Sequence, residues 1–258
     1  MINETNTVKD QYRSSDNLST RISIHDKYST NKQGFGNWIF SNYKYATGCS
    51  ILELGCGTGN MWIGRDEIVN ASSRIVLSDL SEGMIDTAKD NLKSYDKIEY
   101  QVIDIQDIPY EDDSFDIVIG NMMLYHVPDL DKGLSEVRRV LKPGETFYCA
   151  TFGEHGIVEY LSKVLGKYGV TDNTNKIFTL QNGAGLLGGF FSDVERKDYI
   201  DSLAVTDVND IVDYLYSLSS MTDLNQLDRD EIVAALTSQM KDGVLNIPKE
   251  YGMFVCRK

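Results

Sequence analysis

The stretch ILELGCGTGN, residues 51–60, places glycines at positions 55, 57 and 59 directly after a short apolar run. Glycine adopts positive φ easily and has no Cβ atom, so the backbone here can turn sharply and approach a ligand closely. Four uses fit such a loop: a structural turn, a phosphate cradle, a dinucleotide site, or a pocket for another adenosine-bearing ligand. The spacing of the neighbouring residues distinguishes them.

Two of these uses do not match the spacing. A phosphate-binding P-loop requires GxxxxGK[ST], and no such run follows the first apolar stretch. A dinucleotide fingerprint requires GxGxxG, but its third glycine would fall on Asn60 or Trp62. That glycine allows the helix to pack closely on the strand, so its absence argues against a nicotinamide cofactor. The remaining pattern is ExGxGxG, in which Glu53 precedes the first glycine by two residues.

Acidic and imidazole side chains follow the later apolar runs. Asp79 lies twenty residues beyond Gly59, where a carboxylate can accept hydrogen bonds from both ribose hydroxyls. Its alternative role is to cap the next helix, although Ser81 is better placed for that. His126 is a candidate general base for a phenol, hydroxyl or protonated amine. Its alternative is a structural role at the start of the turn HVPD.

The elements that must position these residues alternate between strand-like and helical patterns. Apolar runs predict strands at 49–54, 73–80, 98–105, 115–124, 145–152, 192–200 and 250–258. Helical spacing covers residues 81–95 and 130–141, and the second of these helices is expected to stop at Pro143-Gly144. This alternation predicts an α/β fold with a doubly wound, mostly parallel sheet and helices on both faces. Ligands bind such sheets beyond the carboxyl ends of the strands.

The motifs resemble those of the class I S-adenosylmethionine-dependent methyltransferases. LELGCGTG is similar to their first motif, and VLSDLSEGMI, VIDIQDIPYEDDSFDIVIGNMMLYHVPD and LSEVRRVLKPGE follow in the family's order. The resemblance covers residues 49–152. It implies a seven-stranded sheet of order 3-2-1-4-5-7-6 with the last strand antiparallel. It also implies S-adenosyl-L-methionine as cofactor, S-adenosyl-L-homocysteine as product, and methyl transfer by in-line displacement to a small-molecule acceptor.

The resemblance also implies roles for residues at the strand ends. Glu53 would orient the glycine loop and reach the methionine amino group. Asp104 would hold the adenine amine beside the backbone N–H of Ile105, and backbone groups of Asn121 and Met122 would face the methionine moiety. The full expected cofactor set, which adds the loop and the apolar walls, is Glu53, Gly55, Cys56, Gly57, Gly59, Asp79, Leu80, Met84, Asp104, Ile105, Asn121 and Met122.

The chain outside these motifs is expected to bind the acceptor. We divide it into an N-terminal helical cap or lid (1–46) and a main domain (47–258) with a helical insertion at about 206–246. Tyr28 and Trp38 of the cap are candidates for excluding water or contacting the sulfonium through cation–π attraction. His155 is a candidate substrate contact, and a packing or surface role competes for all three. Because alignment of a sulfonium methyl supplies much of the acceleration, proximity and desolvation should outweigh base catalysis.

Composition narrows the partners. The formal net charge of −14 disfavours nucleic-acid binding, although residues 1–46 hold six Lys or Arg and four Asp or Glu. The four cysteines include no CxxC, so no metal is expected. Without an apolar signal or spanning segment, we expect a cytoplasmic protein. Two other classes stay open: a non-enzymatic S-adenosylmethionine-binding module, and a nicotinamide-dependent oxidoreductase that would share Asp79.

Overall fold

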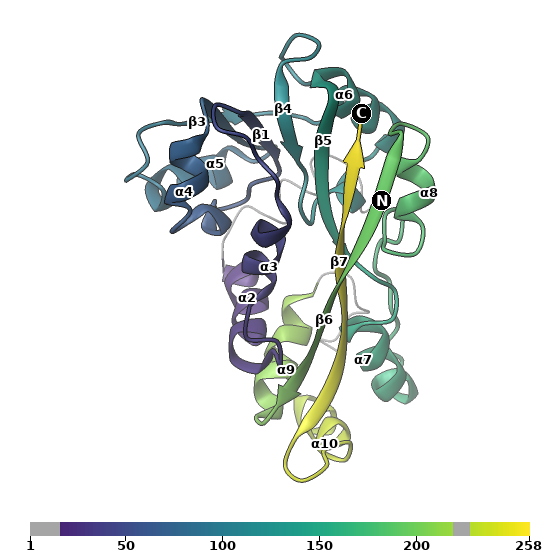
Figure 1. Cartoon of the computed structure of the whole chain (residues 1–258). Coiled ribbons are helices and arrows are strands. Elements are labelled where there is room, and N and C mark those ends of the chain that lie inside the picture. Colours follow the sequence, from purple (N-terminus) through teal and green to yellow (C-terminus); the bar gives the residue numbers. More distant parts are fainter. Residues whose placement is uncertain (1–15, 219–227) are drawn as a thin grey trace.

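A seven-stranded sheet forms the centre of the computed structural model, which describes residues 16–218 and 228–258 (Figure 1). Its strands are β1 (Ser50–Leu54), β2 (Arg74–Asp79), β3 (Ile98–Val102), β4 (Phe115–Ile119), β5 (Leu141–Phe152), β6 (Asp193–Val205) and β7 (Leu245–Arg257). They lie in the order β3-β2-β1-β4-β5-β7-β6. The pairs β1–β2, β1–β4, β2–β3 and β4–β5 are parallel, whereas β7 is antiparallel to both β5 and β6. The predicted fold class, strand order and antiparallel last strand are confirmed.

Helices cover both faces of the sheet, as near-continuous apolar strands require. They include α3 (Phe35–Asn42), α4 (Asp66–Ala71), α6 (Leu130–Val140) and α8 (Gly183–Leu187). Alternate residues of β1 enter two cores: Leu52 and Leu54 belong to the core that contains α6 and α8 residues, and Ile51 to the core with α3 and α4 residues. These three side chains are at most 1% exposed. Burial of each contributes about 1.5–3 kcal/mol.

The helix after β2 begins where the sequence indicates. This helix, α5, spans Glu82–Asn91, and the Ser81 hydroxyl caps it by accepting a hydrogen bond from the Met84 N–H at 3.4 Å. Asp79 does not cap the helix in this way, because its Oδ1 accepts the N–H of Ser81 itself at 2.9 Å. The expected cap at Ser81 is therefore observed.

Five strand boundaries differ from the predicted ones by more than one residue. Strands β3 and β4 end at Val102 and Ile119, before the predicted 105 and 124, and the other three differences lie in β5, β6 and β7. Strand β5 begins at Leu141, directly after α6, so Pro143-Gly144 lies inside the strand rather than before it. Its pairing with β4 shifts there, because Leu141 is opposite Phe115 while Thr146 is opposite Ile117. Strands β6 and β7 pair over thirteen residues each, from Asp193 opposite Arg257 to Val205 opposite Leu245. Backbone pairing extends this edge hairpin beyond its apolar centre.

The long β6–β7 hairpin extends beyond the other strands, and helices from both ends of the chain surround it (Figure 1). The predicted insertion contains α9 (Val208–Ser217) and α10 (Arg229–Thr237), but β7 begins before 246. The N-terminal segment contains α2 (Asp16–Tyr28) and α3, and α2 contacts α9 and β6. Residues 1–15 of the expected cap and 219–227 of the insertion lie outside the described residues. Within the described ranges, no helix is long and apolar enough to cross a bilayer.

A buried ion pair fixes the N-terminal segment to this hairpin. Asp201 of β6 and Lys249 of β7 are opposite each other and form an ion pair. Their side chains are 0% and 3% exposed, respectively. Lys249 Nζ also donates to Ser29 Oγ at 2.8 Å, and the Asn31 N–H donates to Asp201 Oδ1 at 2.9 Å. Because an unpaired buried charge is costly, this network favours the docked position of the segment after α2.

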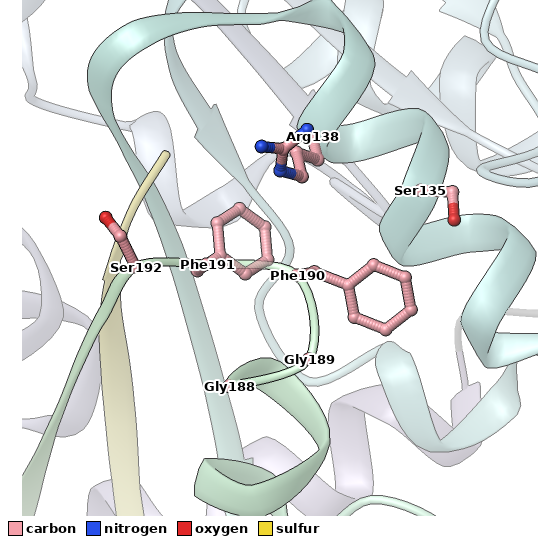
Figure 2. A pocket seen from close by; sticks show the side chains of 7 residues that line it. All are labelled: Ser135, Arg138, Gly188, Gly189, Phe190, Phe191 and Ser192. Atoms are coloured by element: carbon pink, nitrogen blue, oxygen red, sulfur yellow. The ribbon is translucent and has the colours of Figure 1, made fainter.

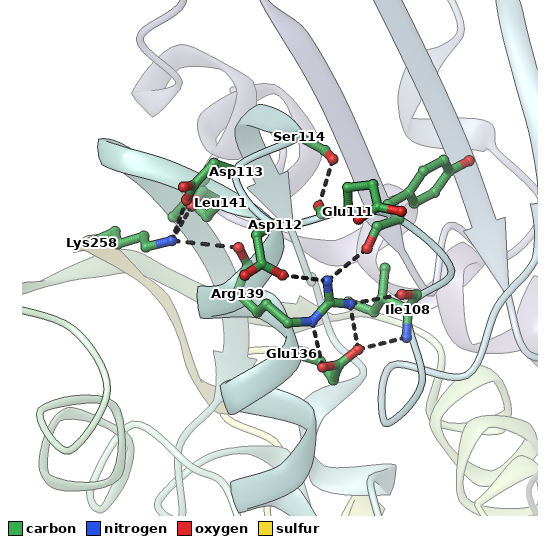
Figure 3. A network of polar contacts seen from close by, with 10 residues as sticks. Ile108, Glu111, Asp112, Asp113, Ser114, Glu136, Arg139, Leu141 and Lys258 are labelled. Atoms are coloured by element: carbon green, nitrogen blue, oxygen red, sulfur yellow. Dashed lines mark hydrogen bonds and ion pairs between the residues drawn. The ribbon is translucent and has the colours of Figure 1, made fainter.

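A second polar network holds the C-terminus at the amino edge of the sheet (Figure 3). Arg139 of α6 donates to Glu136 at 2.7 Å, to Asp112 at 3.0 Å, and to the backbone carbonyl oxygens of the preceding loop. Lys258 donates to Asp113 and to the Leu141 carbonyl, each at 2.6 Å. These contacts lie before β4 and at the start of β5, so they stabilise the fold away from the carboxyl ends of the strands.

Candidate functional site

The glycine loop lies at the carboxyl end of β1, where the chain crosses to β2 on one side and later to β4 on the other. Such a point of reversed strand order is where open α/β sheets bind ligands. Gly55, Gly57 and Gly59 have φ values of +73°, +56° and +71°. Residues other than glycine adopt this region only with strain. A short 3₁₀ helix, η1 (Asn60–Trp62), follows the loop.

The three glycines meet different surroundings. A Cβ atom at Gly55 would lie 2.9 Å from Cβ of Met123, and one at Gly59 would lie 2.8 Å from Cδ1 of Leu92. A Cβ at Gly57 would meet no heavy atom of the described residues within 4 Å. Gly55 and Gly59 therefore allow close packing of the protein on itself, whereas Gly57 borders open space.

Asp79 is tied directly to this loop. Its Oδ2 accepts the Gly57 N–H at 2.9 Å, while Oδ1 accepts the Ser81 N–H at the same distance. Burial raises the pKa of Asp79, although these backbone N–H groups partly offset that effect. Each carboxylate oxygen can accept a second hydrogen bond, so the side chain retains capacity for ligand hydroxyls.

Glu53 is the buried acid of the site, with 3% of its surface exposed. The indole Nε1 of Trp62 donates a hydrogen bond to its Oε2. Burial raises the pKa of Glu53 to about 7, because the Trp62 hydrogen bond offsets the desolvation only in part and Asp79 adds repulsion. The sequence pattern singled out Glu53 but did not identify Trp62 as its hydrogen-bond partner.

Asp104 follows β3 and is half-buried. Its Oδ1 accepts the Gln106 backbone N–H at 2.9 Å and the Gln106 side-chain amide at 3.0 Å. Gln106 Oε1 in turn accepts the Asp129 N–H at 3.1 Å. A ligand amine would share the Asp104 carboxylate with this amide, or displace it. Ile105 beside it is buried.

The other predicted wall residues occupy the same edge of the sheet. Met84 of α5 is buried, while Leu80 and Cys56 are half-buried. Burial and the nearby Glu53 and Asp79 raise the pKa of the Cys56 thiol, so it stays protonated. The Tyr100 hydroxyl of β3 is buried and has no hydrogen-bond partner among the described residues. The sequence did not indicate this, because Tyr100 is simply an aromatic residue within an apolar strand.

Asn121 and Met122 follow β4 and connect it to the N-terminal segment. Asn121 Nδ2 donates to the Tyr43 hydroxyl at 2.7 Å, and its Oδ1 accepts the Ala150 N–H at 3.1 Å. Met122 has a φ of +55°, a conformation that costs a non-glycine residue about 1–3 kcal/mol and occurs often at functional sites. Tyr43 is a site residue that sequence reasoning missed, because only the tertiary fold brings it to Asn121.

His126 ends a second 3₁₀ helix, η2 (Leu124–His126). Its ring lies 4.5 Å from the Tyr125 ring, measured between centroids. Burial and the positive charge of Arg21 lower the pKa of His126 to about 4. The imidazole is therefore neutral near pH 7, which is the form that can accept a proton, but it is a weak base.

The structure places the remaining candidates in other contacts. The Tyr28 hydroxyl donates to Asp210 of α9 at 2.5 Å. Trp38 stacks on Phe35 and packs against Tyr199 of β6, with centroid distances of 5.9 and 5.3 Å. His155 is exposed, and its Nδ1 lies 3.6 Å from a Glu159 oxygen. Glu53, Gly57, Asp79 and Asn121 thus lie at the carboxyl ends of the strands. Tyr28, Trp38 and His155 instead contact α9, β6 and α7 (Ile157–Leu165), respectively.

A separate cavity of about 480 Å³ opens beside α6 (Figure 2). The predicted site residues do not line it. Its walls combine Ser135 and Arg138 of α6 with the segment that follows α8, namely Gly188, Gly189, Phe190, Phe191 and Ser192. The chemistry indicated by the sequence therefore lies elsewhere.

The part of the chain that matches known sequences contains the glycine loop and the strand ends described above. Residues 52–149 match the family described as methyltransferase domain. The ubiquinone/menaquinone biosynthesis C-methyltransferase of Vibrio parahaemolyticus is 33% identical over 124 residues, which cover 47% of this chain and 48% of that protein. The chain therefore matches about half the length of such curated relatives.

Solved structures share the fold over a longer stretch. The phosphoethanolamine N-methyltransferase 2 of Haemonchus contortus, in complex with S-adenosyl-L-methionine, has a TM-score of 0.59 at 18% identity, covering 95% of this chain and 57% of that one. The [4+2]-cyclase SpnF has a TM-score of 0.61 at 16% identity, with 98% and 96% covered. At such identities the likeness is one of fold.

Proposed function

We propose that residues 52–149, which match the methyltransferase domain family, form a class I S-adenosylmethionine-dependent methyltransferase domain, and that the chain uses it to methylate a small-molecule acceptor. The single observation that carries this proposal is the open space at Gly57, bordered by the Asp79 carboxylate that accepts its N–H. A ligand with a ribose beside a backbone turn fits such a cradle. The cofactor would therefore bind at the carboxyl ends of β1 and β2.

The proposed cofactor contacts use different parts of this edge. Asp79 would accept the ribose hydroxyls, and Asp104 with the Ile105 N–H would bind the adenine edge. Leu80 and Met84 supply apolar surface next to β2. Gly55 and Gly59 keep the loop packed against the protein, so that its Gly57 side stays available. When bound, S-adenosylmethionine supplies an electrophilic methyl group on a sulfonium.

The acidic residue Glu53 would receive the positively charged amino group of the cofactor. Its raised pKa reflects a buried carboxyl group that has no cationic partner among the described residues. An ammonium group at this position would favour the carboxylate form and release a proton near pH 7. Asn121 and Met122 would hold the methionine end through the strained segment after β4.

The acceptor would be aligned mainly by position and desolvation, with no strong base. His126 has the neutral form required of a general base, but its lowered pKa limits the proton affinity. We therefore propose that His126 orients the acceptor, and that placing the acceptor atom in line with the methyl supplies most of the rate. Tyr28, Trp38 and His155 stay candidate acceptor-side residues through the segments they connect.

The names of the relatives do not identify the acceptor of this chain. Their names specify quinone substrates, but the family match ends at residue 149. It therefore leaves out α2, α9 and α10, which are the elements expected to surround the acceptor. The cap at 1–46 and the insertion at about 206–246 remain our proposal for that surface.

Isothermal titration calorimetry of the full chain with S-adenosylhomocysteine tests the cofactor site. Incubation with S-adenosylmethionine and a panel of phenols, amines and carboxylic acids then tests transfer, with S-adenosylhomocysteine release as the readout. We expect saturable binding and product release with at least one acceptor. Tight binding with no release across the panel would favour a binding module or another reaction on this fold, and preference for NADH would overturn the proposal.

A further inference from the structure

A cluster of ring side chains lies where α2, α9 and the strand ends meet. The Tyr125 ring packs 4.8 Å from Phe152 at the end of β5, and Phe152 is paired with Tyr251 of β7. His25 of α2 lies 5.8 Å from the Tyr251 ring and 6.3 Å from the Tyr214 ring of α9. We call Tyr125, Phe152, Tyr251, His25 and Tyr214 the ring cluster. It joins five segments of the chain: α2, η2, β5, α9 and β7.

The ring cluster is connected to the proposed cofactor site by the segment after β4. Met123 of this segment is the residue that a Cβ at Gly55 would touch. Two residues later, Tyr125 enters the ring cluster, and His126 packs on Tyr125. The segment from Met123 to Tyr125 therefore connects the glycine loop directly to the ring cluster.

Arg21 of α2 brings a positive charge to this region. Its Nε donates to the Ser217 carbonyl of α9 at 3.1 Å, and its Nη2 donates to the same oxygen. Ser217 lies one helical turn after Tyr214, and the charge of Arg21 lowers the pKa of both Tyr214 and His126 relative to burial alone. Arg21 therefore contacts α9 one turn from Tyr214, and its charge acts on Tyr214 and on His126 beside Tyr125.

The charge of Arg21 is not neutralised in the described part of the chain. Lys249 also approaches the ring cluster, 5.3 Å above the Tyr251 ring, but it is paired with Asp201. By contrast, no carboxylate among the described residues forms an ion pair with Arg21. A half-buried guanidinium in a protein of net charge −14 is stabilised by an anionic partner, and its planar N–H groups match a carboxylate.

Within the described part of the chain, His25 brings an unsatisfied polar atom to the ring cluster. The Nδ1 atom of His25 is buried and has no hydrogen-bond partner among the residues described. Burial and the nearby Lys249 lower the pKa of His25 to about 3. The ring is therefore neutral, although Asp201 favours its charged form. Buried polar atoms are nearly always hydrogen-bonded, which makes this nitrogen available to a polar group of a bound molecule.

We propose that the acceptor is an aromatic carboxylate, whose ring packs on the ring cluster and whose carboxylate pairs with Arg21. This inference rests on the proposed function, because it places the acceptor beside the same glycine loop. Arg21 is then a specificity-determining residue: it selects an anionic acceptor over a neutral one of equal size. A cationic acceptor is repelled by the same charge.

The test compares three probes of matched shape on the full chain saturated with S-adenosylhomocysteine. They are 1-hydroxy-2-naphthoate, its neutral carboxamide, and the cationic 2-(aminomethyl)-1-naphthol, each titrated by calorimetry. We expect the acid to bind about tenfold tighter than the amide, as for one charge-assisted pair, and the amine to bind weakest. Arg21→Gln should abolish the preference for the acid, and Arg21→Lys should keep part of it as a point charge. The exposed Lys163→Gln, which removes an equal charge from α7, should keep all of it.

Several results overturn the proposal. Equal binding of acid and amide, no binding of the acid, or an unchanged preference in Arg21→Gln would each do so. The S-adenosylhomocysteine affinity, measured in the same samples, separates this failure from that of the proposed function. If the wild-type chain binds S-adenosylhomocysteine but not the acid, only the acceptor class is wrong. If it fails to bind S-adenosylhomocysteine, the cofactor site itself is wrong.

Discussion

The indole nitrogen of Trp62 donates a hydrogen bond to the buried carboxyl group of Glu53, so the two residues that flank the glycine loop in sequence are joined in space. Trp62 stands where the third glycine of a dinucleotide fingerprint would fall when counted from Gly57. At that position a glycine would allow the helix to pack closely on the strand. Trp62 instead has a large, fully buried side chain that forms a hydrogen bond with an acid. The loop is thus built around a carboxyl group, which suits a ligand with an amino group.

Trp62→Phe should destabilise the chain, because it removes the N–H donor and leaves the buried carboxyl group without this partner. We expect the free energy of unfolding, measured by urea denaturation, to fall by about 1–3 kcal/mol beyond any packing loss. Trp62→Phe in a Glu53→Leu background, which offers no acceptor to the indole N–H, is the matched comparison. If the tryptophan substitution costs the same in both backgrounds, the hydrogen bond contributes nothing measurable.

The affinity for S-adenosylhomocysteine should rise with pH. The pKa of Glu53 is raised to about 7, and an ammonium ligand prefers the ionised form, so affinity should increase from pH 5.5 to about 7 and then level off. Calorimetry across this range measures it. In Glu53→Gln the increase should disappear while binding weakens. A wild-type affinity that does not change with pH would remove Glu53 from the amino-group site.

The same raised pKa has a consequence for stability. Because the folded protein retains the Glu53 proton to a higher pH than the unfolded chain does, this group lowers stability as pH rises from its ordinary 4.5 through about 7. Glu53→Gln should therefore melt higher than wild type by more at pH 8 than at pH 5. A difference in melting temperature that is equal at both pH values would contradict the raised pKa.

Tyr43→Phe should weaken cofactor binding from outside the matched domain. The substitution removes the hydroxyl that accepts the Asn121 amide and frees the segment that holds Met122 at positive φ. We expect S-adenosylhomocysteine affinity to fall about tenfold, as for one lost buried hydrogen bond. Tyr45→Phe, in the same segment, should bind like wild type. Equal effects of both substitutions would show that Tyr43 does not position the site.

Two of the three histidines should stay neutral well below pH 6. The pKa of His25 is lowered to about 3 and that of His126 to about 4, mainly by burial. Imidazole NMR signals recorded from pH 7 to 4, with free histidine as reference, measure this directly. Since the unfolded chain binds these protons near 6.5 and the folded chain does not, stability should fall as pH drops below 6.5. Normal titration of His126 would contradict its buried position.

The sequence predicted the parts of the molecule that depend on local spacing. Positive φ at Gly57, the acid at Asp79 and the Ser81 cap follow from short-range backbone chemistry. The strand order came from resemblance, because the alternation of elements alone does not fix which strands are neighbours. The ends of β6 and β7 were missed because edge strands pair through their backbones, even where their side chains are polar.

The remaining site residues depend on tertiary contacts. Tyr43 and Arg21 belong to a segment whose aromatic and basic residues show no periodic pattern, and the fold alone brings them to Asn121 and Ser217. Tyr100 looked like an ordinary strand residue, and its unsatisfied hydroxyl is visible only once its neighbours are known. Such residues carry no sequence spacing that could identify them.

The open space at Gly57 tests the central claim most directly. Gly57 and Gly144 both have positive φ and room for a Cβ atom, but Gly144 lies within the first residues of β5, away from the glycine loop. Valine at either position should strain the backbone by a similar amount. By calorimetry, we predict that Gly57→Val loses S-adenosylhomocysteine binding, while Gly144→Val binds like wild type. Wild-type affinity in Gly57→Val, or an equal loss in both variants, would contradict a cofactor site at this loop.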